Sequence, residues 1–271
     1  MGDAVKPSVA IGFFDGVHLG HQAIIAGADR VITFRNHPLS VIKPQCAPRL
    51  ITSINERIEL IGKPCEIIDF TLEFAGFSPM EFAERYLGDA GEIRCGEDWR
   101  FGNGGEGDAK WLMEHGYKVS VVPYAEFEGE RISSSRIRKA LEEGEIRKVN
   151  AMLGRRFTCE GRRFKGKGCG GKMGFPTINL KTEIPLKRGV YAVEAMGKSG
   201  VANFGLAPTM GETAWKEPVL EVHFPGATKL DDAGEERVKV KFVDFIREER
   251  KFGSIEELKR QIAEDCDKGR I

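Results

Sequence analysis

The pattern of apolar residues changes near Leu153-Gly154, and this change limits the fold more than any other feature of the sequence. Before it, short apolar runs alternate with helix-start signals such as Ser53-Ile54-Asn55-Glu56 and Ser78-Pro79-Met80-Glu81, in which a capping serine precedes glutamate by three residues. The alternation predicts an α/β fold, in which helices cover a parallel sheet. Strands are expected at residues 9–11, 31–34, 66–70, 93–95 and 119–122, and two further short helices at 136–143 and 145–153.

After Gly154, strand-like segments follow one another at short spacing, separated by glycine and proline turns. This pattern predicts a small antiparallel β-barrel. The capping box Ser254-Ile255-Glu256-Glu257 opens a closing C-terminal helix that carries Ile255, Leu258 and Ile262 on one face. We therefore expect an α/β plus all-β chain, with domains at residues 1–153 and 154–271. The barrel strands are expected at residues 157–163, 190–195, 201–204, 219–224 and 238–242.

Composition gives no sign of a nucleic-acid or membrane partner. The 41 Lys+Arg and 41 Asp+Glu residues balance, so no global charge favours either partner. No apolar run approaches the roughly 18 residues that a spanning helix needs, and no signal-peptide core is present at the start. The six cysteines include no Cys-x-x-Cys pair, which favours free thiols in a reducing cytoplasm over a zinc site or a disulfide frame.

A glycine-rich stretch with two histidines follows the first expected strand. It reads Gly12-Phe13-Phe14-Asp15-Gly16-Val17-His18-Leu19-Gly20-His21. Glycines let the backbone turn sharply and approach a ligand closely, and His18 and His21 share one face of a starting helix. Backbone N–H groups at a helix start attract phosphate. We predict a triphosphate site at the carboxyl end of the first strand. The alternative is a glycine turn with two surface histidines.

Three later segments are expected at the same edge of the sheet. Asn36-His37-Pro38 follows the second strand, Gly96 to Gly102 follows a later one, and Ile132 to Arg138 opens a helix. In the last segment, serine hydroxyls at a helix start can bind phosphate oxygens, and two arginines can clamp phosphate. Taken alone, this segment is equally compatible with an ordinary serine N-cap beside solvated arginines.

These motifs, taken in order together with Phe77-Ser78-Pro79, resemble the FAD synthetase module of bacterial bifunctional riboflavin kinase/FAD synthetases. The resemblance implies a Rossmann-like nucleotidyltransferase domain that moves AMP from ATP onto FMN and releases pyrophosphate. It implies that His18 and His21 bind the ATP phosphates and the developing charge, and that the flavin or its metal is placed by Asn36, Asp98 and Arg100. The ATP site implied by the resemblance comprises Gly12, Phe13, Phe14, Asp15, Gly16, His18, His21, Ser133, Ser134, Arg136 and Arg138.

A second glycine-rich stretch, Gly166 to Lys172, imitates two nucleotide-binding motifs. It contains G-x-G-x-x-G, and it differs from the P-loop motif at one position. Both motifs require a helix immediately afterwards. A proline and β-formers follow instead, so we reject both readings. The stretch is compatible with a flap that covers bound phosphates. The alternative is a flexible basic hairpin. The residues of this expected kinase ATP site are Gly166, Lys167, Gly168, Lys172, Gly174, Thr177 and Asn179.

Thr177 and Asn179 are expected on one face of a strand, because side chains alternate along it. A hydroxyl and an amide oxygen side by side suit Mg²⁺, which prefers oxygen ligands. The alternative is a surface Thr-Asn pair in a turn. The stretch Gly174 to Leu180 resembles the riboflavin kinase signature, and the resemblance extends over residues 154–268. It implies that Glu221 is the base that activates the ribityl 5′-hydroxyl for attack on the γ-phosphate of ATP.

Two departures from the family concern the kinase half. Cys169 and Gly171 stand where relatives usually carry arginines, and Pro225-Gly226-Ala227 replaces the usual acidic Asp-Gly loop. We predict an enzyme that makes FMN from riboflavin and FAD from FMN, with ATP and Mg²⁺ and without nucleic-acid or membrane partners. One rival keeps a single activity, with the kinase the half that changed. Another is a flavin or nucleotide sensor without turnover.

Overall fold

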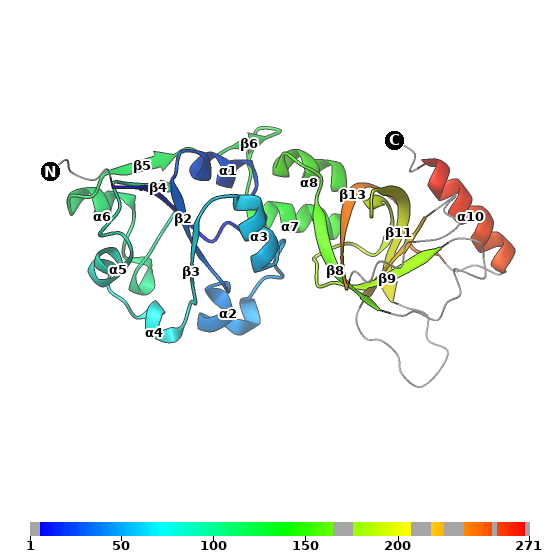
Figure 1. Cartoon of the computed structure of the whole chain (residues 1–271), viewed down its shortest axis with the longest axis horizontal. Helices are drawn as coiled ribbons and strands as arrows, with labels where there is room; N and C mark the ends of the chain where they lie inside the picture. Colours follow the sequence, from blue (N-terminus) through cyan, green and yellow to red (C-terminus); the bar gives the residue numbers. More distant parts are fainter. Residues whose placement is uncertain (1–5, 165–175, 207–217, 225–235, 251–253, 269–271) are drawn as a thin grey trace. The chain divides into compact units, whose positions relative to one another are not determined.

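The computed structural model describes residues 6–164, 176–206, 218–224, 236–250 and 254–268 (Figure 1). The chain divides into two compact units, Met1–Ser134 and Ser135–Ile271.

The first unit is built on a parallel sheet, as predicted. Within its described residues the strands are β1 (Ser8–Ile11), β2 (Arg30–Phe34), β3 (Cys65–Ile68), β4 (Glu92–Gly96) and β5 (Val119–Val122), in the order β3-β2-β1-β4-β5. The chain winds outward from β1 to β3 and then returns to lay β4 on the other side of β1. The connection after β1 therefore leads to a strand on one side of the sheet, and the connection after β4 leads to a strand on the other side. In α/β sheets, ligands bind where the connections diverge in this way, beyond the carboxyl ends of the strands.

Helices pack on both faces of this sheet. Helices α1 (Leu19–Ala26) and α3 (Ile54–Ile61) pack on the face that carries Ala10 and Val31. Helices α5 (Pro79–Tyr86) and α6 (Ala109–Glu114) pack on the opposite face. The capping boxes predicted at Ser53 and Ser78 are both present. Smaller elements that the sequence did not predict are α2 (Leu39–Ile42), α4 (Leu72–Ala75), the 3-10 turns η1 (Pro44–Cys46) and η2 (Asn103–Gly105), and the hairpin strands β6 (Glu126–Phe127) and β7 (Glu130–Arg131).

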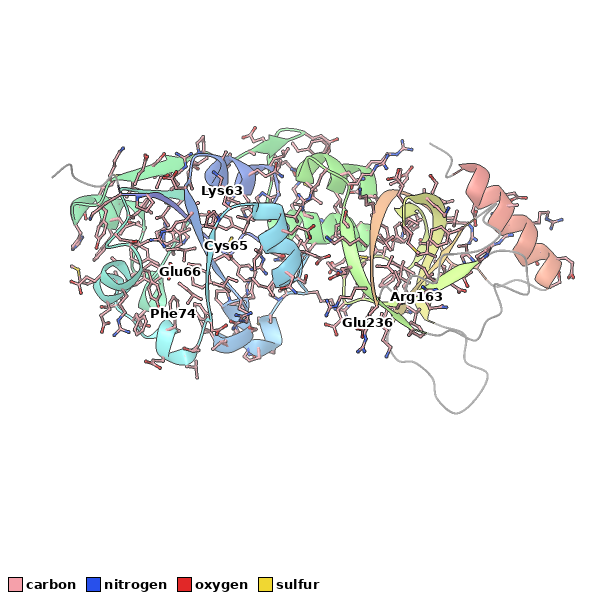
Figure 2. The ribbon with its side chains drawn as sticks, viewed as in Figure 1. Lys63, Cys65, Glu66, Phe74, Arg163 and Glu236 are labelled. Atoms are coloured by element: carbon pink, nitrogen blue, oxygen red, sulfur yellow. The ribbon has the colours of Figure 1, made fainter. Side chains whose placement is uncertain are left out.

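One lysine attaches the connection between α3 and β3 to the end of α1 by hydrogen bonds. Lys63 lies just before β3, which begins at Cys65 and Glu66, and Figure 2 labels all three. The Lys63 ammonium donates to the Ala26 carbonyl at 3.0 Å and also to the Ala28 carbonyl. These contacts hold the C-terminal end of α1 beside the start of β3.

The second unit contains a closed antiparallel barrel, again as predicted. Within the residues described there, the strands run in the order β10-β11-β12-β9-β8-β13. Tyr191 and Phe157 both pack their rings on Phe242, at centroid distances of 5.4 Å. The Arg163 N–H, near the end of β8, donates at 2.7 Å to the carbonyl of Glu236, the residue before β13, and both residues are labelled in Figure 2. The strands are β8 (Thr158–Phe164), β9 (Thr177–Lys181), β10 (Gly189–Ala195), β11 (Lys198–Leu206), β12 (Pro218–His223) and β13 (Arg237–Arg247), followed by helix α10 (Ile255–Lys268).

Two helices precede the barrel, α7 (Ser134–Glu143) and α8 (Ile146–Leu153), and α8 is tied to it by side-chain bonds. The Asn150 amide accepts from Phe157 N at 2.6 Å and donates to the Phe242 carbonyl at 3.1 Å. Arg147 forms an ion pair with Asp244 at 2.6 Å. Contacts therefore group α8 with the barrel. The functional boundary at Leu153-Gly154 stays a prediction.

Candidate active sites

The loop after β1 is strongly bent, as its glycines predicted. Its backbone passes through positive φ at Phe14 (56°), Gly16 (79°) and Val17 (40°). Positive φ is uncommon for Phe and rarer for a β-branched residue such as Val. Gly12 is required for another reason: a Cβ there would lie 2.9 Å from the Phe14 ring. The sequence Gly-Phe-Phe-Asp-Gly therefore encodes one particular loop shape at the carboxyl edge of the sheet.

Asp15 holds this loop in place. It is 0% exposed, and its carboxylate accepts from Ile51 N at 3.0 Å, Thr52 N at 3.1 Å and the Thr52 hydroxyl at 3.2 Å. The Thr52 hydroxyl in turn accepts from Gly16 N at 3.0 Å. A buried carboxylate is stable when such donors satisfy it. Any contribution of Asp15 to ATP binding therefore acts through the shape of the loop, and sequence reasoning missed Thr52, its partner.

His18 and His21 lie together at the start of α1, as predicted. His18 is the N-cap residue: its Nδ1 accepts from His21 N at 3.3 Å. The two imidazole rings stack with centroids 3.5 Å apart, and the Phe14 ring meets His21 edge-on at 5.3 Å. Because Nδ1 of His18 accepts a hydrogen bond, a neutral His18 carries its proton on Nε2 and can donate from there. The pair is thus a preformed set of donors next to the loop.

Ser134, the last residue of the first unit, brings part of a third predicted segment to the loop. The Ser134 hydroxyl donates to the Asp15 carbonyl at 2.9 Å, so the serine segment lies against the loop after β1. Arg136 and Arg138 follow within the next turn of α7, and the Arg138 guanidinium lies 3.5 Å from the Ser135 hydroxyl. Ser133 precedes the helix.

The residues expected to place the flavin lie beyond the ends of two strands. Asn36 follows β2, and its amide exchanges two hydrogen bonds with the backbone of Phe70, at 2.9 and 3.0 Å. Asp98 follows β4 and pairs with Arg131 at 2.5 Å. The Arg131 guanidinium also lies 3.5 Å from the centroid of the Tyr124 ring. Asn36 thus bridges two strand ends.

Sequence reasoning did not predict two features of this region, the ion pair of Arg131 and the hydrogen bond of Arg100. Arg131 was missed because the two-residue strand β7 carries no periodic pattern. Arg100, the other predicted flavin residue, donates to the Trp99 carbonyl at 2.9 Å.

In the barrel, the predicted kinase residues form a row on its outer face. Glu221 on β12 lies directly opposite Asn179 on β9 and, on its other side, opposite Asn203 on β11. Thr177 lies on the same face as Asn179, because the alternate residues of β9 are buried in the barrel. Directly opposed side chains have Cβ atoms about 4.5–5.5 Å apart. The strand register therefore brings a carboxylate, a hydroxyl and an amide together. The sequence predicted the shared face of Thr177 and Asn179, and the register adds Glu221 to it.

Sequence reasoning missed His223, which lies opposite Thr177. It is only 8% exposed, and its Nδ1 is buried with no hydrogen-bond partner among the described residues. Burial lowers the pKa of its imidazole, and the Glu221 carboxylate opposes this effect. The signal for this residue was the two-residue spacing from Glu221 within one strand.

The oxygen donors of Thr177 and Asn179 are of the kind that Mg²⁺ prefers. The described residues contain no group of three or more His, Cys, Asp or Glu that could hold a metal ion. Thr177 and Asn179 instead supply neutral oxygens beside the Glu221 carboxylate, and Mg²⁺ is commonly held by few protein oxygens together with phosphates and water. The flap residues Gly166, Lys167, Gly168, Lys172 and Gly174 lie outside the described residues.

Comparison with known families identifies the two units as a pair of transferases that act on flavins. Residues 3–136 match the family model for FAD synthetase, and residues 153–271 match the model for riboflavin kinase. The bifunctional riboflavin kinase/FMN adenylyltransferase of Bacillus subtilis is 32% identical, over 97% of this chain and 91% of that protein. The Escherichia coli K12 enzyme of the same name is 32% identical over 95% of this chain and 90% of its own length. The chain belongs to the family of bifunctional riboflavin kinase/FMN adenylyltransferases.

A solved structure covers the whole chain with the same fold. It is titled a macrolide-efflux protein from Streptococcus pneumoniae, and it aligns with a TM-score of 0.83 at 28% identity, over 100% of this chain and 95% of its own. In the described part of the present chain, no helix has the length and apolar character to cross a membrane.

Proposed function

We propose that the two activities use separate sites, one in residues 1–153 and one in residues 154–271, and that ATP is the donor in both. The observation that carries this proposal is the presence of two different sets of groups among the described residues. The loop after β1 carries a stacked histidine pair, whereas the barrel carries Glu221 beside the Asn179 amide and on the face that carries the Thr177 hydroxyl. The first set suits charge neutralisation, and the second suits activation of a hydroxyl.

In adenylyl transfer, the phosphate of FMN attacks the α-phosphorus of ATP, and the bond to the β-phosphate breaks to release pyrophosphate. His18 Nε2–H and the loop backbone donate to the phosphate oxygens as charge moves to the leaving group. Ser133, Ser134, Arg136 and Arg138 hold the triphosphate from the other side, while Asn36, Asp98 and Arg100 place the flavin. Positioning and charge neutralisation are enough for such an in-line displacement, so no covalent nucleophile is needed.

In the kinase reaction, Glu221 accepts the proton of the riboflavin 5′-hydroxyl as its oxygen attacks the γ-phosphorus, and ADP leaves. Thr177 and Asn179 would hold Mg²⁺, which supplies charge neutralisation at the phosphates when bound. The kinase ATP site is completed by Gly166, Lys167, Gly168, Lys172 and Gly174. Glu221 lies beside Asn179, so the base and the phosphate anchor share one face.

The remaining parts of the proposal concern organisation and location. We propose adenylyl transfer by residues 1–153 and kinase activity by residues 154–271, in a cytoplasmic enzyme without nucleic-acid partners. The equal numbers of basic and acidic residues, 41 each, support the absence of a nucleic-acid partner.

One chromatographic assay tests the proposal. The full chain is incubated with riboflavin, ATP and Mg²⁺, and FMN and FAD are followed together. We expect FMN to rise first and FAD to follow. Formation of FMN alone would show that the adenylyltransferase site is inactive, and absence of both products would contradict the whole assignment.

A further inference from the structure

Arg57 is a buried arginine next to the loop after β1, and no local pattern in the sequence marks it. It lies within α3 and is 0% exposed. Its Nη1 donates to the carbonyls of Phe13 at 3.0 Å and Phe34 at 2.8 Å. The guanidinium also lies 4.1 Å from the centroid of the Phe13 ring. Both carbonyls stand at the carboxyl edge of the sheet, where β1 and β2 end.

The Arg57 guanidinium retains unused donors. Its Nε and Nη2 atoms are buried and have no hydrogen-bond partner within the described residues. Burial lowers the pKa of this guanidinium, while the Asp15 carboxylate opposes the effect. Arginine nevertheless stays charged at neutral pH. A buried positive charge that bonds to neutral carbonyls makes the electrostatic potential around it more positive, and this favours the binding of an anion nearby.

The Phe13 carbonyl is held by a second buried donor. The Thr33 hydroxyl on β2 donates to it at 3.1 Å, and Thr33 is 0% exposed. In a trans peptide the carbonyl and the following N–H point in opposite directions, so Thr33 and Arg57 together direct the Phe14 N–H away from themselves. Phe14 is 3% exposed, and no acceptor in the described part of the chain takes its N–H. A buried N–H without an acceptor is costly unless a ligand accepts from it.

We propose that Arg57 and Thr33 are positioning residues for adenylyl transfer. They hold the Phe13 carbonyl so that the Phe14 N–H faces an oxygen of the bound triphosphate, and the charge of Arg57 strengthens that contact. This inference rests on the proposed function of the loop as a phosphate site. Both residues act through the Phe13–Phe14 peptide and not by direct contact with the nucleotide.

The test uses inorganic pyrophosphate as a product inhibitor of FAD formation by the full chain, with FMN and ATP supplied. Arg57→Met should raise the Ki for pyrophosphate and the KM for ATP about tenfold, the order expected for losing one charged donor. Arg57→Lys keeps the positive charge but loses the planar guanidinium that stacks on Phe13, so both constants should rise less than they do in Arg57→Met. Thr33→Val keeps a similar shape and should lower kcat several-fold with a smaller change in Ki.

Arg94→Met is the matched control. Arg94 Nε also donates to a carbonyl, that of Ile24 at 3.1 Å, but its guanidinium packs beside Gly27, at the end of α1 remote from His18. This variant should keep the wild-type Ki and KM. Circular dichroism and thermal unfolding of each variant report on loss of folded protein, because the kinase rate belongs to the other unit.

The result that overturns the inference is a wild-type Ki and KM in Arg57→Met, or an equal increase of Ki in Arg57→Met and Arg57→Lys. If Arg57→Met does not fold, Arg57→Lys and Thr33→Val decide: a wild-type kcat in Thr33→Val overturns the positioning role. A His18→Ala/His21→Ala variant serves as reference. If that variant also leaves pyrophosphate inhibition unchanged, the phosphate site itself is wrongly placed, and the failure belongs to the proposed function.

Discussion

Glu221 and Asn179 lie directly opposite each other on neighbouring antiparallel strands, β12 and β9, with both side chains on the outer face of the barrel. Strand register fixes this relationship, because a shift of one residue would turn either side chain into the barrel interior. The buried neighbours Leu180 and Leu220, both 0% exposed, set the register through the core. Core packing thus places the proposed base beside a proposed oxygen ligand.

Replacement of Glu221 by Gln should remove the base while retaining size and most hydrogen bonding. General-base catalysis typically contributes about 10²–10⁴-fold, so FMN formation should fall by that factor with little change in riboflavin or ATP affinity. Steady-state kinetics with riboflavin varied at saturating ATP measure the effect. FAD formation from supplied FMN is the internal control. Near-wild-type kinase turnover would show that another group is the base.

Thr177→Ala should behave differently, because it removes an oxygen ligand and leaves the base intact. The defect in FMN formation should recover in part as Mg²⁺ is raised, since a weakened site fills by mass action. A titration of kinase rate against Mg²⁺ in wild type and variant measures the shift. Thr158→Ala, a change on β8, is the control for loss of one strand threonine. A defect that is equal at every Mg²⁺ concentration would contradict the ligand role.

The sequence predicted the folds, and the candidate site groups, from short patterns in which each residue interacts with near neighbours in the chain. The capping serine Ser53 and the alternation of Thr177 and Asn179 are examples, because each depends on neighbours within four residues. Thr52, Arg57 and His223 were missed because their roles depend on contacts across the fold. Asp15 meets Thr52 from 37 residues away, and nothing in the local sequence marks that pairing.

The division into units was the least predictable feature. The change of pattern at Gly154 marks where strands begin, but α8 packs on the barrel through Asn150 and Arg147. A helix that packs on the next domain has the same sequence pattern as one that packs on the previous domain. Which domain it joins is decided by side chains that are distant in the sequence.

A fragment of residues 135–271 should therefore be more stable than one of residues 154–271. The shorter fragment loses the Asn150 bonds and the burial of Val149 and Leu153, both 0% exposed. Burying one such side chain is worth about 1.5–3 kcal/mol, so the free energy of unfolding should fall by at least about 2 kcal/mol. Urea unfolding followed by circular dichroism measures it. Equal midpoints for the two fragments would contradict the docking of α8 on the barrel.

Cys95 should resist alkylation in the native chain well above neutral pH. Burial raises the pKa of its thiol to about 11, and the Asp108 carboxylate adds to the effect. At pH 8 its thiolate fraction is then about 10⁻³, and only thiolate reacts. The exposed Cys46 is the internal control. Peptide mass spectrometry after iodoacetamide treatment should find Cys46 modified and Cys95 unmodified until denaturant is added. Equal native rates would contradict the burial of Cys95.

The most direct test of two separate sites is complementation between two variants, each altered in one unit. His18→Ala/His21→Ala should convert riboflavin to FMN and stop there, whereas Glu221→Gln should make FAD only when FMN is supplied. We predict that neither variant alone forms FAD from riboflavin at more than a small fraction of the wild-type rate, and that an equimolar mixture does. FMN released by the first variant serves the second. A mixture that accumulates FMN without forming FAD, while Glu221→Gln still converts supplied FMN at the same concentration, would contradict the account.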